Sequence, residues 1–158
     1  MPLFHTIKPQ DIWYGDHLYI WISPFHQHHG IVLFVNKEDA DESQILEFNT
    51  PDGSRKPSRA HIQVVSLKNF QRDSTLKRVM YGCKYAKFKL AGSAYEFQSQ
   101  KPEFVVDRAK HILEQIEIGE CFLMPTDPTS TPLWETKYNL ILRNCECLAF
   151  WCKTGIWF

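Results

Sequence analysis

Apolar and polar positions alternate in short runs along the first half of the chain, and turn-forming residues separate the runs. Between residues 17 and 23 the alternation places Leu18, Ile20 and Ile22 on one face, which predicts a strand. The next apolar run follows so closely that the two strands are expected to form a hairpin. The predicted strands cover residues 17–23, 28–35, 45–49 and 61–67, with a further extended stretch over residues 79–90.

After Pro102 the apolar positions recur at three- and four-residue spacing, which predicts an amphipathic helix that Gly119 would close. A second, shorter helix is expected to begin at Cys145. Asn144 suits the N-cap of this helix, and Gly155 suits the left-handed position after its end. The apolar stripe of the helix that follows Pro102 comprises Phe104, Val105, Arg108, Ala109, Ile112, Leu113 and Ile116.

Strands that precede helices along the chain indicate the α+β class, with an antiparallel sheet packed against helices. The chain has 158 residues, no internal repeat and no low-complexity linker, which predicts a single domain over residues 1–158. Residues 120–136 contain three prolines and are expected to form an irregular connection.

Composition narrows the classes of protein to consider. The 44% hydrophobic residues indicate a packed globular protein, and no apolar run is long enough to span a bilayer. The 18 basic and 18 acidic residues balance, which argues against a nucleic-acid partner. Five cysteines without regular spacing, behind an N-terminus that lacks a secretory pattern, favour reduced thiols in the cytoplasm.

Cys145 is the first candidate for chemistry because it lies at the predicted start of a helix. The positive end of the helix dipole favours a thiolate, which is the form that attacks carbonyl carbon. The alternative is a buried packing residue, since Cys145, Leu148, Ala149 and Cys152 share one helical face.

A base for such a thiol would be His28, which lies in a predicted strand with the small Gly30 on the same face. A third polar group is needed to orient the imidazole, and Glu47 in the neighbouring strand is the candidate. The alternative for Glu47 is an acidic residue on the solvent face.

A metal site is the competing interpretation, because His26, His28, His29, Cys145 and Cys147 carry suitable ligand atoms. The chain has no Cys-x-x-Cys pair, and two thiols two residues apart on a helix point in different directions. We therefore expect neither a metal nor another cofactor.

Several segments together resemble the lecithin:retinol acyltransferase-like (LRAT, or NC-domain) family. They are residues 15–20, residues 28–33 with the sequence His-His-Gly, and the Asn-Cys-Glu and Cys-Lys-Thr-Gly motifs at residues 144–146 and 152–155. The resemblance covers residues 11–155. It implies a circularly permuted papain-like (NlpC-type) α+β domain, in which the histidine strand precedes the cysteine helix.

The resemblance implies thiol acyl chemistry, in which Cys145 is the nucleophile and His28 the base. Glu47 takes the third position, which is commonly histidine in the family, and Cys147 lies where histidine or aspartate is usual. The expected substrate is an acyl ester, often a glycerophospholipid, whose acyl group passes to water, an amine or an alcohol. A peripheral contact with a membrane or a protein is a further expectation.

Two other functions remain open from the sequence. Five tryptophans and the apolar segment Ile156-Trp157-Phe158 would suit a non-catalytic binding or assembly subunit that keeps the fold. Papain-like chemistry would also permit hydrolysis of peptide or isopeptide bonds by Cys145.

Overall fold

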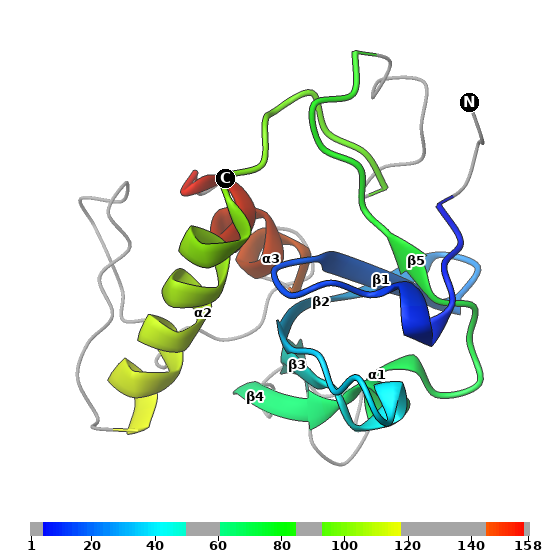
Figure 1. Ribbon diagram of the computed structural model, residues 1–158. Helices are drawn as coiled ribbons and strands as arrows, with labels where there is room; N and C mark the ends of the chain where they lie inside the picture. The colour runs from blue at the N-terminus through cyan, green and yellow to red at the C-terminus, as the bar shows by residue number, and fades with distance from the viewer. Residues whose placement is uncertain (1–4, 50–60, 85–92, 118–144, 157–158) are drawn as a thin grey trace.

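The computed structural model describes residues 5–49, 61–84, 93–117 and 145–156, which form an α+β fold around one antiparallel sheet (Figure 1). The strands are β1 (His17–Ser23), β2 (His26–Phe34), β3 (Gln44–Asn49), β4 (His61–Ser66) and β5 (Lys77–Arg78), in the order β4-β3-β2-β1-β5. The helices are α1 (Leu67–Gln71), α2 (Pro102–Glu117) and α3 (Cys145–Thr154), with 3₁₀ turns η1 (Pro9–Asp11) and η2 (Ala40–Glu42).

The predicted α+β class, the hairpin and the four main strands are confirmed to within two residues at each end. The extended stretch over residues 79–90 is wrong in its described part. Residues 79–84 contain no strand, because β5 ends at Arg78 and Met80 forms only an isolated bridge with Ala94. Gly82 turns the chain there with a φ of 66°. Residues 85–92 and the connection at 120–136 lie outside the described residues, as do Gly119 and Asn144.

Two local features differ from what the sequence pattern predicts. Ile22 is 41% exposed although it alternates with the buried Leu18 and Ile20, because the β1–β2 register shifts between Trp21 and Ser23. Helix α1 follows β4 directly and was not among the predicted helices. Its N-cap is Ser66, whose hydroxyl accepts a hydrogen bond from the backbone N–H of Asn69.

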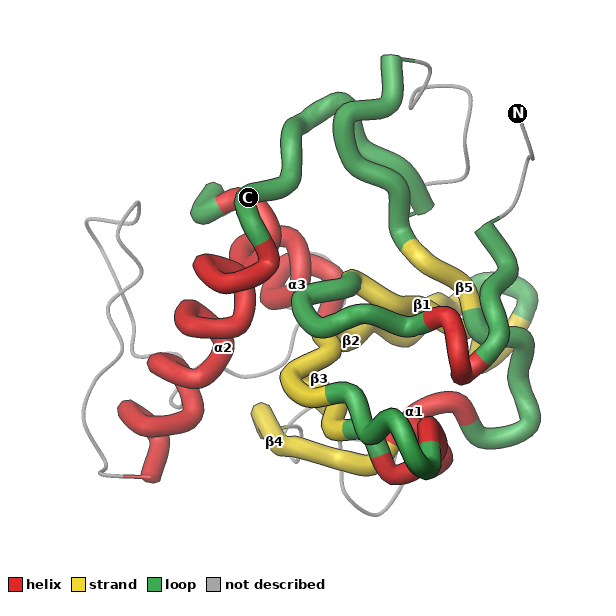
Figure 2. Tube along the Cα trace, in the orientation of Figure 1, coloured by secondary structure: helices red, strands yellow, loops and turns green. Residues whose placement is uncertain are grey.

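Both faces of the sheet are buried. Helices α2 and α3 pack together on one face, while α1 lies on the other (Figure 2). The first core joins Ile31, Leu46 and Phe48 of the sheet to Val105, Ala109, Ile112, Leu148, Ala149 and Cys152 of the two helices. The second joins Leu18, Ile20, Val32 and Ile45 to Ile12, Leu67, Phe70 and Leu76.

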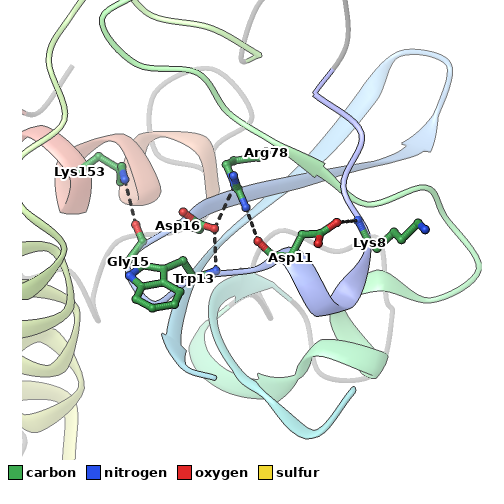
Figure 3. A network of polar contacts seen from close by, with 7 residues as sticks. All are labelled: Lys8, Asp11, Trp13, Gly15, Asp16, Arg78 and Lys153. Atoms are coloured by element: carbon green, nitrogen blue, oxygen red, sulfur yellow. Dashed lines mark hydrogen bonds and ion pairs between the residues drawn. The ribbon is translucent and has the colours of Figure 1, made fainter. Parts of the chain in front are cut away.

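Helix α3 is buried on all sides, since Glu146 is its only residue that keeps substantial exposure. Its last turn is fixed to the turn before β1, because Lys153 Nζ donates to the carbonyl oxygen of Gly15 over 3.0 Å. The neighbouring Asp16 forms an ion pair of 3.0 Å with Arg78 Nε, as Figure 3 shows. The C-terminal end of α3 is therefore anchored to the sheet.

No helix in the described ranges is long and apolar enough to cross a bilayer.

Candidate active site

The first part of the site is a contact between two neighbouring strands. Gly30 of β2 lies opposite Glu47 of β3, so His28 is the diagonal neighbour of Glu47 on the same face. His28 Nε2 is 2.5 Å from Glu47 Oε2, and both side chains are buried. The other carboxylate oxygen, Glu47 Oε1, accepts a hydrogen bond of 2.9 Å from Gln63 Nε2 of β4.

Packing fixes the imidazole from the other side. The ring of Phe70 in α1 lies 5.2 Å from the ring of His28, centroid to centroid. Gly30 makes this approach possible, because a Cβ at that position would lie 2.8 Å from Phe70 Cε2 and 2.7 Å from Ile45 Cγ2. The absence of a side chain at Gly30 therefore leaves room for the ring of Phe70 to pack against His28.

The second part of the site is an opening in the sheet. The ladder between β2 and β3 ends at the pair Gly30–Glu47, whereas the ladder between β3 and β4 continues to Asn49–His61. Beyond Glu47, strand β3 pairs only with β4, and no described residue pairs with β2 on that side.

The thiol lies at this opening. The backbone N–H of Val32 donates to Asp16 and its carbonyl oxygen accepts from Gly15, so both groups point toward the β1 side. Because backbone groups alternate between the two sides of a strand, the N–H of His29, three residues earlier, points toward β3. That N–H donates to Cys145 Sγ, with a nitrogen–sulfur distance of 3.4 Å. The sulfur thus takes the hydrogen bond that β3 would otherwise receive.

The structure brings the three predicted site residues together. The imidazole of His28 is hydrogen-bonded to Glu47, and Cys145 Sγ accepts from the backbone N–H of the next residue, His29. Cys145 also raises the pKa of His28 through a hydrogen bond and its charge. Since Nε2 faces the carboxylate, Nδ1 is the nitrogen left for the thiol. The order carboxylate, imidazole, thiol is the arrangement that activates a nucleophile.

The charges favour the protonated imidazole. Burial alone would lower the pKa of His28, but the hydrogen bonds and negative charges of Cys145 and Glu47 outweigh it and raise the pKa to about 9. Burial would raise the pKa of Glu47, yet the His28 imidazolium and the Gln63 amide hold it below its usual value. The contacts with Glu47 and Cys145 therefore favour the imidazolium form of His28.

Two further buried histidines lie beside this series. His17 Nε2 is 2.8 Å from His29 Nδ1, and the other nitrogens of the two rings contact Tyr81 and Gln27. Burial lowers the pKa of His17 well below its usual value. Burial and the nearby His28 and His26 lower the pKa of His29 to about 3, so both rings are neutral.

The metal interpretation concerned His26, His28, His29, Cys145 and Cys147. Across the described ranges, no group of three or more His, Cys, Asp or Glu residues could hold a metal ion. His28 and His29 have their ring nitrogens directed to Glu47, His17 and Gln27 instead.

The other described cysteines, Cys83, Cys147 and Cys152, are buried and form no disulfide in the structure. Burial raises the pKa of Cys152 to about 12, against the effect of the nearby Arg108. Cys152 is thus an inert packing residue, as its helical face predicted, and Cys121 lies outside the described residues.

Gln63, Phe70 and Gln27 are site residues that the sequence did not single out. Gln63 lies opposite Glu47 in the β3–β4 register, so a known register would have identified it. Comparison with known protein families and with curated proteins finds no match for this chain.

Proposed function

We propose that this chain is a thiol-dependent acyltransferase or phospholipase A-type hydrolase with the permuted papain-like fold of the LRAT-like family. The observation that carries the proposal is the buried series Glu47, His28, Cys145, with the thiol in the first turn of α3. The motifs around His28 and Cys145 add the substrate class, an acyl ester such as a glycerophospholipid.

Acylation begins with the Cys145 thiolate, which attacks the carbonyl carbon of the ester. A carbon–sulfur bond forms, and the carbonyl oxygen becomes an oxyanion. When this intermediate collapses, the carbon–oxygen bond of the ester breaks and His28 gives its proton to the leaving oxygen. The products are an alcohol, which is a lysophospholipid when the donor is a diacyl lipid, and a thioester on Cys145.

Deacylation uses the same groups in reverse. The neutral His28 takes a proton from water, an amine or an alcohol, which attacks the thioester carbon. The carbon–sulfur bond breaks, the acyl group leaves on its new acceptor, and the thiolate–imidazolium pair forms again. Glu47 holds Nε2 throughout, so Nδ1 stays directed at the sulfur.

The test is intact mass spectrometry after incubation with phosphatidylcholine vesicles. We expect a fatty-acyl mass increment on the wild-type protein that hydroxylamine removes and that Cys145→Ala lacks. His28→Ala should slow its formation by about 10²-fold or more, because proton transfer to the leaving group is lost. Cys83→Ala is the matched control, since it removes a buried thiol away from His28 and should acylate normally.

The outcomes separate the proposal from its rivals. Acylation of Cys145→Ala at the wild-type rate would contradict the proposed nucleophile. No increment on the wild-type protein, together with slow alkylation of Cys145 by iodoacetamide, would favour the non-catalytic binding subunit. No increment but fast alkylation would favour a papain-like hydrolase of peptide or isopeptide bonds.

A further inference from the structure

A chain of hydrogen bonds runs from the aromatic side of the site to Gln27 of β2. The hydroxyl of Tyr81 lies 2.8 Å from His17 Nδ1, and His17 Nε2 lies 2.8 Å from His29 Nδ1. His29 Nε2 then lies 3.1 Å from Gln27 Oε1. These contacts link the two neutral histidines and fix both ends of each ring.

All the hydrogen bonds in this series donate in the same direction, from Tyr81 toward Gln27. A neutral imidazole donates from one nitrogen and accepts at the other, so each contact determines the next. Because Gln27 presents its oxygen, His29 donates from Nε2 and accepts at Nδ1. His17 therefore donates from Nε2 and accepts at Nδ1, where the hydroxyl of Tyr81 donates. Burial raises the pKa of Tyr81, so this hydroxyl keeps its proton.

This direction leaves the amide nitrogen of Gln27 turned away from His29. Gln27 Nε2 is shielded from solvent and has no hydrogen-bond partner in the described part of the chain. An unpaired buried donor lowers stability, and such groups call for an explanation in native structures. A substrate atom that accepts a hydrogen bond would supply the partner.

The amide lies on the side of β2 where the thiol is found. Gln27 and His29 share one face of the strand, and α3 packs on this face. The backbone N–H of His29 donates to Cys145 Sγ. His28, which lies between Gln27 and His29 in the strand, is the proposed base. Three consecutive residues of β2 thus contribute a free amide donor, the base and a contact to the nucleophile.

We propose that Gln27 is a further catalytic residue, whose Nε2–H donates to the carbonyl oxygen of the substrate as it becomes an oxyanion. The inference rests on the proposed function and adds a group that stabilises the tetrahedral intermediate. His29, His17 and Tyr81 act as positioning residues that keep the amide nitrogen directed at the substrate.

The experiment compares two reactions of the same thiol. Gln27→Met should slow acylation by phosphatidylcholine vesicles about 10²–10³-fold, the usual loss for one oxyanion donor. Alkylation of Cys145 by iodoacetamide should keep its wild-type rate, because displacement at a saturated carbon forms no oxyanion. Gln44→Met is the matched control, since Gln44 is exposed at the start of β3, and both of its rates should be unchanged.

A second variant, Gln27→Glu, keeps the inference testable if Gln27→Met fails to fold. Gln27→Glu keeps an oxygen for His29 but removes the donor, so it should show the same split between the two reactions. Wild-type acylation in both variants would overturn the inference and leave the proposed function intact. A parallel fall in acylation and alkylation would also overturn it, because Gln27 would then only support the structure. An inert wild-type protein would refute both proposals.

Discussion

A carboxylate at the third position changes the charge state of its histidine. Glu47 carries a full negative charge against Nε2, so it favours the imidazolium more strongly than a neutral histidine could. The raised pKa of His28 follows from this contact and from Cys145. A glutamate where the LRAT-like family that the sequence resembles commonly has histidine is therefore compatible with the proposed thiol chemistry, and it predicts a distinct pH dependence.

Glu47→Gln should move the alkaline limb of the acylation rate to lower pH. In the wild-type protein the limb follows loss of the proton from His28 near pH 9, and removal of the carboxylate lowers the pKa of His28. We expect a shift of about one unit, and a smaller loss of rate than in His28→Ala, because the amide oxygen can still accept from Nε2. The measurement is the pH–rate profile of acyl-enzyme formation.

Glu38→Gln is the control for this shift, because Glu38 is exposed after β2 and should leave the profile unchanged. If the limb keeps its position in Glu47→Gln, Glu47 does not set the pKa of His28.

At the scale of elements, the hydrophobic period predicted β1 to β4 and the helices α2 and α3, because a period depends only on neighbours in the sequence. It did not predict the two-residue strand β5. Helix α1 was missed because it spans five residues and carries too few turns to show a period. The stripe of α3 was correct but incomplete, since Phe150 and Trp151 outside it are also buried. Burial on all sides depends on distant elements that the local pattern does not encode.

The same limit applies to the site. Cys145, His28 and Glu47 could be chosen from residue type, strand face and motif, and the structure places them in contact. Gln63 and Gln27 could not be chosen, because their roles depend on the register of β4 and on a hydrogen-bond chain that crosses several elements.

Lys153→Met should loosen the anchor between α3 and the turn before β1. The variant loses the hydrogen bond to Gly15 and the cation near Asp16, while its apolar stem can still pack. We expect the free energy of unfolding in urea to fall by about 1–2 kcal/mol. Lys101→Met, at an exposed position, should leave it within about 0.5 kcal/mol of wild type.

For the whole molecule, the buried histidines predict opposite effects at acid and alkaline pH. His17 and His29 have lowered pKa values, so below pH 6.5 the unfolded chain binds more protons and stability falls. Glu47 adds to this loss, because its lowered pKa stabilises the fold only while it is ionised. His28 acts in the other direction, and its contribution is lost as pH rises from 6.5 through about 9.

Stability should therefore be greatest near neutral pH. The measurement is the free energy of unfolding in urea from pH 4 to pH 10. At pH 5, the neutral His29 should cost about 2 kcal/mol, so His29→Gln should flatten the acid limb by roughly that amount. His61→Gln changes an exposed histidine of β4 and should leave the limb as it is. An equally steep acid limb in His29→Gln would contradict this account.

The order in which the chain folds follows from the distances along the sequence. His28 and Glu47 are 19 residues apart on adjacent strands, whereas 116 residues separate His29 from Cys145. Closing the longer loop costs more entropy, so we expect the acid–base pair to form first and the thiol to join it late. A partly folded chain would then carry an ordinary cysteine, and the reactive one would exist only after folding is complete.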